Sequence, residues 1–422
     1  MGKWLVVAVV SALIPGCKFG SSAFTCKEDS QCAGGGTCVD KPNGMCALSD
    51  STCTSGYRYD NSAGDHSGQC TGESGTGNTD GGTDGSTIDA SPFCYGTGLV
   101  KVCLAAAPTQ PRMFTGAGTT TIDTTDASMC ATTISGATSY CVIAATDITI
   151  NQRVRGLGPK PIVMIATGTI TSNATGLIDV SSLRPRVAGE VETGAGADSA
   201  LCNAGTAGNG VGGGAGGSFF GGGGSGGGVG AGGTAGTAIT AVTELRGGCP
   251  GQNGNGGAAA AARGHGGGAV YLIAGTSITL AGGINAGGEG GAGAGKTNNG
   301  AGGGGGGSGG MIGLDAPVIA VTSALVANGG GGGEGSSNQN DGKDGTDATV
   351  PAAAAGGAGG TINGGDGGDG SAGAAGGGGQ PGKNGNTGQN GGHGGGGGGA
   401  GHIRAPAGAS LGTMVSPAAV NL

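Results

Sequence analysis

Glycine at every third position of residues 364–399 is the sequence feature that most constrains the fold. Every third residue from Gly364 to Gly397 is glycine. A period of three belongs neither to an α-helix nor to a β-strand, but to an extended left-handed polyproline-II helix. Glycine leaves one face of such a helix bare, so neighbouring extended segments can approach it and exchange backbone hydrogen bonds. We therefore expect a polyglycine-II-like bundle within one chain.

Two other interpretations of this run were weighed. A collagen strand has many prolines between its glycines, whereas Pro381 is the only proline of the run. A flexible low-complexity tail stays open as an alternative, because glycine density by itself produces such runs.

A repeat elsewhere in the chain favours the ordered interpretation. Residues 162–171 return as 270–279 at a constant offset of 108 residues. A third copy at 311–321 fits after a slip of one residue, and a weaker fourth copy lies at 401–406. Each copy holds short strands, which suits one coil of a parallel β-helix. Between the copies the chain makes three glycine-rich excursions, whose ends the coils would hold together: 205–268, 287–310 and 329–400.

Short β-branched runs with glycine or polar corners also fill 141–182, without an amphipathic helix pattern. We predict an all-β fold: short parallel β-helix-like coils with long glycine-rich, polyglycine-II-like insertions, preceded by a small disulfide-rich module. The predicted organisation is a lipoprotein signal peptide (1–16), a tether (17–25), a cysteine-rich module (26–70), a flexible linker (71–90), a β-rich domain (91–182) and a glycine-rich β-repeat domain (183–422).

The N-terminus has the features of an export signal. Lys3 supplies a positive charge, and the apolar stretch that follows is too short to span a bilayer. It ends in Ile14-Pro15-Gly16-Cys17, which resembles the bacterial lipobox. The resemblance implies cleavage before Cys17 and lipid attachment to it, and Lys18 then favours the outer membrane. An ordinary signal peptide with an incidental cysteine is the alternative.

The chain has 13 cysteines, so lipidation of Cys17 leaves an even number for disulfides in an oxidising compartment. No CxxC pair occurs, so we expect no zinc or other metal, and no cofactor. Module 26–70 resembles small EGF-like modules, and its pairing stays open. Cys202 and Cys249 are expected to bridge the first excursion. The disulfide candidates are Cys26, Cys32, Cys38, Cys46, Cys53, Cys70, Cys94, Cys103, Cys130, Cys141, Cys202 and Cys249.

Several catalytic motifs match only because glycine is dense. Residues 290–297 satisfy the phosphate-loop pattern with Lys296 and Thr297, but the following Asn-Asn-Gly cannot begin a helix. Ser225 and Ser308 lie in GxSxG patterns without a plausible histidine–aspartate partner, since the four histidines are scattered. We reject both motifs.

Calcium was considered at two places. Residues 364–369 match the start of a calcium-binding nonapeptide, but no tandem copy follows. Asp341, Asp344 and Asp347 are spaced by three and could share one face of an extended helix. Solvated loop carboxylates are the favoured interpretation, with calcium as the alternative.

The motifs GGGAVYLIAG, GGSGGMIGLDAP and GGGGAGHIRAP resemble glycine-rich, PGRS-like bacterial cell-surface lipoproteins. The proline-glutamate domain that opens PE-PGRS proteins is missing here. Residues 205–400 are also similar in spacing to the glycine-rich extracellular domain of certain receptor tyrosine kinases. The first resemblance implies a surface protein without defined catalytic residues.

The net charge is −8 and no basic cluster occurs, which argues against nucleic acid as a partner. We expect a non-enzymatic, lipid-anchored structural or adhesion protein of the cell surface, with the membrane and surface glycan or extracellular matrix as partners. The alternative is a β-helix carbohydrate-active enzyme, a polysaccharide lyase or hydrolase, with Asp179, Arg184 and Arg186 as the nearest candidates. A water-ordering glycine surface is a third hypothesis.

Overall fold

The computed structural model describes residues 25–32, 36–39, 44–50, 53, 55–60, 63, 70–71, 93–135, 138–184, 193–358, 364–386 and 390–421. These residues form two compact units, one within Met1–Thr87 and one within Ile88–Leu422. Neither unit contains an α-helix in its described part, and the two 3₁₀ turns are η1 (Asp29–Gln31) and η4 (Gly257–Ala259). The predicted all-β class, with parallel sheets and a disulfide-linked N-terminal region, is confirmed for this part of the chain.

Several predicted features lie outside the described residues. These are the signal peptide 1–16, nearly all of the tether including Cys17, the linker beyond Thr71, and Arg186.

The N-terminal unit is a small antiparallel sheet held together by disulfides. Its strands are β1 (Thr37–Val39), β2 (Met45–Ser49) and β3 (Tyr57–Tyr59), in that order. The disulfides join Cys26 to Cys38, Cys32 to Cys46 and Cys53 to Cys70. Among the described residues of this unit, the buried cluster consists of Cys26, Cys32, Cys38 and Cys46. Cross-links therefore replace an apolar core in this unit.

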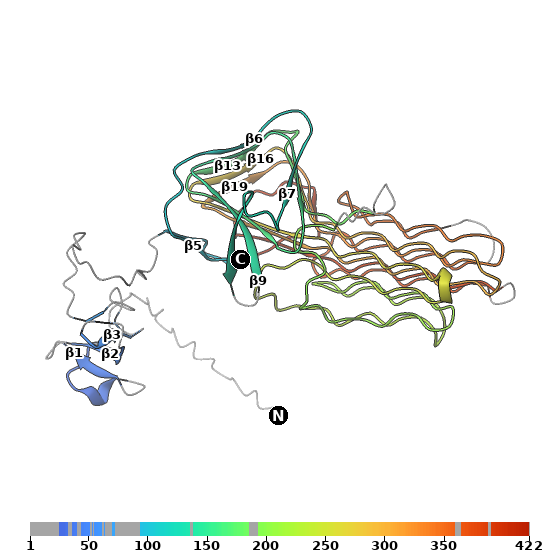
Figure 1. Ribbon diagram of the computed structural model, residues 1–422, viewed down its shortest axis with the longest axis horizontal. Helices are drawn as coiled ribbons and strands as arrows, with labels where there is room; N and C mark the ends of the chain where they lie inside the picture. Colours follow the sequence, from blue (N-terminus) through green and yellow to red (C-terminus); the bar gives the residue numbers. More distant parts are fainter. Residues whose placement is uncertain are drawn as a thin grey trace, which may run out of the picture. The chain divides into compact units, whose positions relative to one another are not determined.

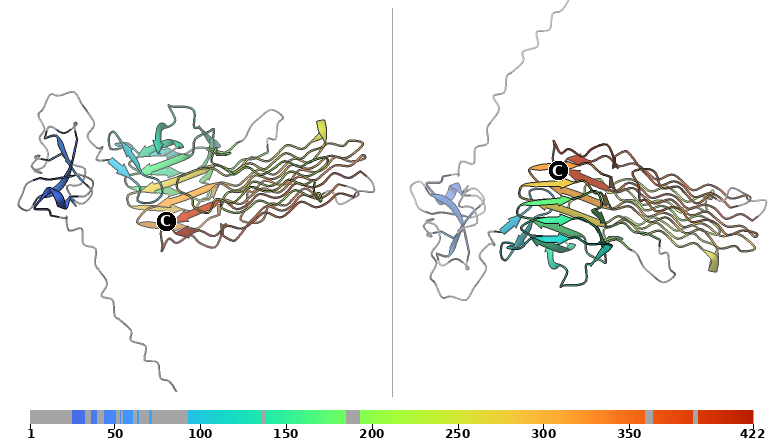
Figure 2. Two further views of the ribbon diagram at one scale, coloured as in Figure 1. Left: turned by 90° about the horizontal axis from the view of Figure 1, so that it is seen from below. Right: turned by 90° about the horizontal axis from the view of Figure 1, so that it is seen from above.

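The second unit contains three parallel sheets (Figures 1 and 2). Sheet one comprises β6 (Arg112–Phe114), β10 (Ile148–Ile150), β13 (Thr169–Ser172), β16 (Ser277–Leu280) and β19 (Val318–Val321). Sheet two comprises β7 (Thr119–Asp123), β11 (Arg153–Leu157), β14 (Leu177–Asp179), β17 (Ile284–Asn285), β20 (Leu325–Val326) and β22 (Val415–Ser416). Sheet three comprises β9 (Thr138–Ala145), β12 (Ile162–Ala166), β15 (Ala269–Ala274), β18 (Met311–Asp315), β21 (His402–Ala405) and β23 (Val420–Asn421). Strand β8 (Ala131–Ser135) pairs antiparallel with β9 at the edge of sheet three.

The chain visits the three sheets in turn. Strands β10, β11 and β12 belong to sheets one, two and three, and β13, β14 and β15 repeat that order. Side chains that alternate along each strand meet in one interior cluster, which includes Ile148, Val154, Met164 and Leu272. The outer face of sheet three is covered separately, by the hairpin β4 (Phe93–Tyr95) and β5 (Val102–Leu104) and by apolar residues near Leu245.

The register of the sheets reproduces the sequence repeat. Ile162 pairs with Val270 and Ile170 with Ile278, both at the predicted offset of 108 residues. In the third copy, β18 pairs with β15 and β19 pairs with β16, and the two offsets differ by one residue, as predicted. The fourth copy is β21, which pairs with β18. Strands from 91–182 and from 183–422 lie next to one another in all three sheets, so both ranges belong to one compact unit.

All three glycine-rich insertions leave the strands at the same corner. Each follows a strand of sheet two and returns at the next strand of sheet three: β14 to β15, β17 to β18, and β20 to β21. In the preceding turn, β11 and β12 are separated by only a short corner. The insertions run beside one another as long extended segments, on the right of Figure 1.

Backbone hydrogen bonds with a period of three join the insertions. The segments 211–217, 303–309 and 393–399 come from the first, second and third insertion, and we call them the three-segment ring. The N–H groups of Gly214 and Gly217 donate to Gly303 and Gly306. The N–H groups of Gly303, Gly306 and Gly309 donate in turn to the carbonyl groups of His393, Gly396 and Gly399. The N–H groups of His393, Gly396 and Gly399 donate to the carbonyl groups of Val211, Gly214 and Gly217, which closes the ring. Each insertion thus satisfies backbone groups of the other two.

The periodic run 364–399 is folded back on itself. Gly373 and Gly376 have positive φ at its first turn, and Asn390 has a φ of 53° at its second. Gly394 and Gly397 donate to Lys383 and Gln380 across the second turn. The run therefore forms several packed segments instead of one extended helix, because a single helix would leave its backbone groups without protein partners.

Candidate functional site

A polar cleft lies on the outer face of sheet two. Its volume is about 450 Å³, and its lining residues are Arg153, Leu177, Asp179, Leu183, Arg184, Asn285, Asp347 and Thr349. Strand periodicity explains why the lining residues of β11, β14 and β17 point outward. Val154, Ile178 and Ile284 point into the core, so the residues next to them in these strands face outward. Asp347 and Thr349 come from the third insertion.

Asp179 holds two arginines of the neighbouring strand. Its Oδ1 accepts from Arg155 Nη1 at 2.9 Å and from the Ser181 hydroxyl at 2.6 Å. Its Oδ2 accepts from Arg153 Nε at 3.0 Å, and Nη2 of Arg153 contacts the same oxygen. Asp179 is 2% exposed and Arg155 is 5% exposed. A buried carboxylate with this many donors is a fixed ionic anchor of the sheet and not a free acid or base.

Arg184 lines the same cleft and is held by several contacts. Its backbone N–H donates to Asp347 Oδ2 at 3.0 Å, and its Nη2 donates to the Gly290 carbonyl. Glu289 lies 3.8 Å and Asp344 3.6 Å from the guanidinium. Arg184, which follows β14 of sheet two, therefore contacts residues of both the second and the third insertion.

An acid–base pair adjoins Glu289 at the return of the first insertion. Nδ1 of His265 lies 2.6 Å from Asp198 Oδ2, and the His265 backbone N–H donates to Glu289 Oε2 at 3.0 Å. Asp198 has a φ of 54°, a strained conformation for a residue other than glycine. His265 and Asp198 are far apart in sequence but meet at the base of one insertion.

Three groups of this network have raised pKa values. Burial raises the pKa of Glu289 and that of Asp347, because a low-dielectric environment disfavours the charged carboxylate. The hydrogen bond to Asp198 raises the pKa of His265 by favouring the imidazolium. Perturbed groups next to a cleft are typical of functional sites, although ion-pair networks also produce them.

Neither serine of the GxSxG patterns belongs to this network. The Ser308 hydroxyl accepts from Cys249 N at 2.7 Å and donates to the Gly309 carbonyl. Ser225 is exposed on the first insertion. The structure thus supports the rejection of a nucleophile elbow.

Sequence reasoning found only part of the cleft. Asp179 and Arg184 line the same cavity, as their selection implied. Arg153 and Asp347, which line the cleft, and Glu289, which lies 3.8 Å from Arg184, were not selected for this site from the sequence. The alternation of Arg153 and Arg155 around Val154 was a usable signal, because it places both arginines on one outward face. Nothing in the local sequence indicates that Glu289 and Asp347 lie at the same corner.

Asp341, Asp344 and Asp347 do share one face, as expected. They accept hydrogen bonds from the backbone N–H groups of Lys296 (2.7 Å), Gly293 (2.7 Å) and Gly290 (2.9 Å), respectively. Successive aspartates on such a segment are about 9 Å apart, so each binds its own N–H group. In the described part of the chain, the group of three potential metal ligands found close together is Cys26, Cys32 and Cys46, whose sulfurs are in disulfides.

The same hydrogen bonds explain why 290–297 is not a phosphate loop. The segment is extended, its N–H groups at Gly290, Gly293 and Lys296 already face carboxylates, and no helix follows Thr297 in the described residues. An anion-binding loop needs free N–H groups at a helix N-terminus.

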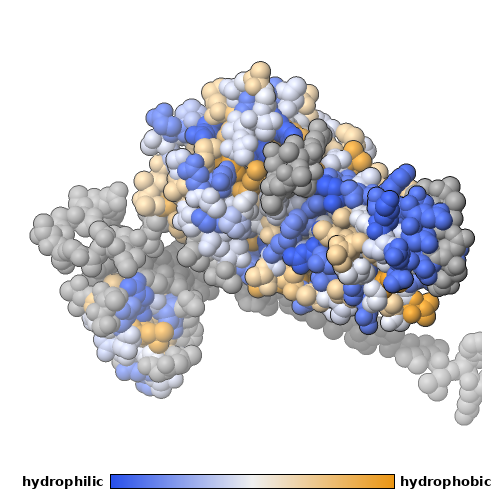
Figure 3. Space-filling model, turned by 45° about the vertical axis from the view of Figure 1, so that its right-hand side comes forward, coloured by the Kyte–Doolittle hydropathy of each residue, from blue (hydrophilic) through white to orange (hydrophobic). Residues whose placement is uncertain are grey.

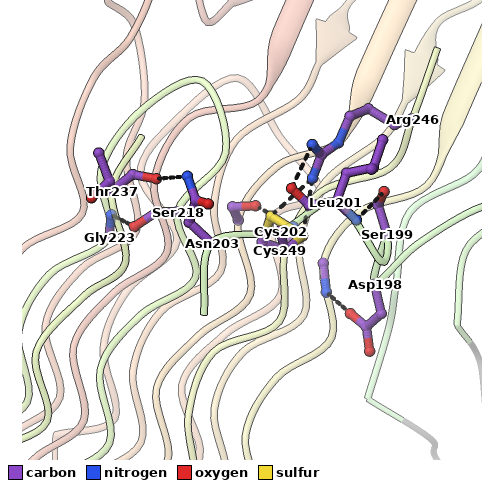
Figure 4. Close-up of a disulfide and its surroundings, with 12 residues drawn as sticks. Asp198, Ser199, Leu201, Cys202, Asn203, Ser218, Gly223, Thr237, Arg246 and Cys249 are labelled. Atoms are coloured by element: carbon purple, nitrogen blue, oxygen red, sulfur yellow. Dashed lines mark hydrogen bonds between the residues drawn. A yellow bond between two sulfur atoms is a disulfide. The ribbon is translucent and has the colours of Figure 1, made fainter. Parts of the chain in front are cut away.

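The disulfide Cys202–Cys249 closes the first insertion near a buried arginine (Figure 4). Arg246 donates to the Leu201 carbonyl at 3.0 Å and to Cys202 Sγ at 3.1 Å, and lies 5.0 Å from the centre of the Phe219 ring. Burial lowers the pKa of Arg246 to about 10. The remaining pairs of this unit are Cys94–Cys103 and Cys130–Cys141, so the twelve candidate cysteines form six disulfides.

Comparison of the chain with protein-family models, with curated proteins and with solved structures gives no match. Within the described residues, no helix has the length and apolar character needed to cross a membrane.

Proposed function

We propose that this protein is a non-enzymatic, lipid-anchored protein of the bacterial cell surface, similar to PGRS-like lipoproteins, with a structural or adhesive role. The observation that carries the proposal is the arrangement of the three insertions. They leave one corner of a stacked β scaffold and pack on one another through backbone hydrogen bonds. Much of the chain thereby builds an extended surface, which suits display.

The proposal includes a more detailed description of the architecture. In our interpretation the three sheets are the faces of a short parallel β-helix, and the insertions form a polyglycine-II-like bundle. The strand order one, two, three and the closed bonding of the three-segment ring support this view. On the face drawn in Figure 3, hydrophilic and hydrophobic residues are interspersed over this bundle.

Attachment through lipid at Cys17, in the outer membrane, is the proposed mode of anchoring. It is supported by the lipobox-like Ile14-Pro15-Gly16-Cys17. We expect the wild-type chain in the membrane fraction of a bacterial host and a Cys17→Ser variant in the soluble fraction. A variant retained in the membrane as fully as the wild type would refute the anchor.

A second candidate function is a β-helix carbohydrate-active enzyme. The cleft favours it, because arginines and carboxylates line one cavity, and the His265–Asp198 pair adjoins Glu289, which lies next to Arg184. The engagement of both Asp179 oxygens by arginines weighs against it, since that carboxylate has no free role in proton transfer.

One pair of assays separates the two functions. The purified chain is incubated with a panel of bacterial and plant polysaccharides, and both retention and release of new reducing or unsaturated ends are measured. Saturable retention without new ends is the expected result. Cleavage that persists through repurification and is lost in a Glu289→Gln variant would replace the adhesion proposal with the enzyme.

A further inference from the structure

We propose that the cleft on sheet two binds the anionic group of an acidic sugar, a carboxylate or a sulfate, between the guanidinium groups of Arg153 and Arg184. This inference takes its biological setting from the proposed adhesive function and assigns a ligand class to it. The two arginines line the same cavity of about 450 Å³. Guanidinium groups are the side chains best suited to planar oxyanions.

Both guanidiniums keep donors for a ligand. Arg153 uses Nε and Nη2 on Asp179, so its Nη1 has no partner among the described residues. Arg184 uses Nη2 on the Gly290 carbonyl, and its Nε is buried 3.6 Å from an Asp344 oxygen, so the donor left for a ligand is Nη1, which has no hydrogen-bond partner among the described residues. The side chain of Arg153 is 39% exposed and that of Arg184 is 25% exposed. Both side chains are thus held in fixed positions, and part of each remains exposed.

The rest of the lining suits a sugar. Thr349 and Asn285 add a hydroxyl and an amide, which can pair with sugar hydroxyls, and Leu177 and Leu183 add small apolar surfaces.

The charges around the two arginines differ. On the Arg153 wall, Asp179 is paired with Arg153 and Arg155. On the Arg184 wall, Glu289, Asp344 and Asp347 oppose the single guanidinium at neutral pH. An anion therefore meets partial repulsion at the Arg184 wall.

Acidification relieves that repulsion. The raised pKa values of Glu289 and Asp347 mean that both carboxylates take up protons at a higher pH than ordinary acids do. His265, which faces Glu289, Asp198 and Arg263, also stays protonated to a higher pH than usual, so it adds positive charge in the same direction. Binding of an anion that stays ionised, such as a sulfate ester, should tighten as the pH falls from neutral.

The test is calorimetric titration of the full chain with three oligosaccharides of equal length: one of uronic acids, one sulfated and one uncharged. Inorganic sulfate is a fourth probe. The variants are Arg153→Gln, Arg184→Gln and Arg153→Lys, and the matched control is Arg112→Gln in β6, which lies on sheet one outside the cleft. Thermal unfolding of every variant is measured in parallel, so that misfolding is recognised.

We expect binding of an acidic sugar, a loss of about tenfold in affinity for each glutamine variant, partial recovery in Arg153→Lys and no change in the control. Equal affinity for the uncharged sugar, wild-type affinity in both folded glutamine variants, or no measurable binding by the wild type would overturn the proposal. Inorganic sulfate bound as tightly as either acidic sugar would reduce the cleft to an adventitious anion site and also overturn it.

The outcomes also separate this inference from the proposed function. If polysaccharide retains the chain and the cleft variants bind it with unchanged affinity, the adhesive function is kept and the cleft is rejected as the binding site. If the chain cleaves an acidic sugar and both arginine variants abolish this cleavage, the cleft is kept as the binding site and the non-enzymatic role is rejected.

Discussion

At the scale of single residues, glycine in the insertions is required for close approach more than for unusual backbone angles. A Cβ atom added at Gly216 would lie 1.9 Å from the Gly397 carbonyl oxygen, and one added at Gly305 would lie 1.9 Å from that of Ala215. Such distances are far inside van der Waals contact, so the neighbouring segment would have to move. Gly222 in the same insertion has no atom within 4 Å of its added Cβ.

These two positions give a matched test. We expect Gly216→Ala to lower the free energy of unfolding by about 1–3 kcal/mol or more, because the new methyl group collides with backbone that cannot rotate away. Gly222→Ala should stay within about 0.5 kcal/mol of the wild type. Denaturant unfolding followed by circular dichroism measures both. Equal stability of the two variants would mean that the insertions are not packed as described.

At the scale of elements, each insertion depends on its ends and on its neighbours. Ordering glycine costs more conformational entropy than ordering any other residue. The cost is offset where strands fix both ends of an insertion and where the three-segment ring satisfies backbone groups. In the first insertion the disulfide Cys202–Cys249 closes a loop with a sequence separation of 47, which limits the freedom of its unfolded state.

Removing that disulfide should therefore loosen one insertion. We expect the double variant Cys202→Ser/Cys249→Ser to lose about 2–4 kcal/mol of stability, with faster amide exchange concentrated in 203–248. Strands β12 and β15 should keep their protection, since their core side chains are untouched. The control is Cys94→Ser/Cys103→Ser, which opens a loop with a separation of only 9 in the β4–β5 hairpin. Faster exchange spread evenly over all strands would contradict the prediction.

At the scale of the whole molecule, the two compact units are stabilised by different forces. In the part of Met1–Thr87 that the structure describes, the buried cluster is formed by four cysteines. The unit within Ile88–Leu422 has a continuous apolar interior shared by its three sheets. Redox conditions should consequently act on the two units very differently.

Reduction of the full chain tests this difference. With an excess of reductant at neutral pH, we expect amides of the described residues in 26–71 to exchange like those of a free chain. Strands of sheets one, two and three should remain protected, because their apolar core does not need sulfur cross-links. The unreduced chain is the control, and complete reduction is checked by thiol alkylation. Lasting protection in β1, β2 and β3 after full reduction would show that the N-terminal unit has another source of stability.

The sequence by itself determined much of the scaffold. The repeat of 162–171 at 270–279 fixed the register of two sheets, because equivalent residues of stacked turns need the same inward side chains. The β class followed from short β-branched runs, and the pairing of Cys202 with Cys249 was expected because one precedes the first insertion and the other lies within it. Asp179 and Arg184 could be selected as candidate site residues because few charged residues lie near the strand ends.

Only the tertiary structure decided how the glycine segments pair and what completes the cleft. A glycine period of three shows that each segment can pack against another extended segment. It does not determine which segment becomes the neighbour, because the glycine faces of all segments are alike. Turns at Gly376 and Asn390 and the shared corner between sheets two and three make that choice. The same corner brings Asp347 and Glu289 to Arg184, a proximity that arises from chain return and leaves no trace in the local sequence.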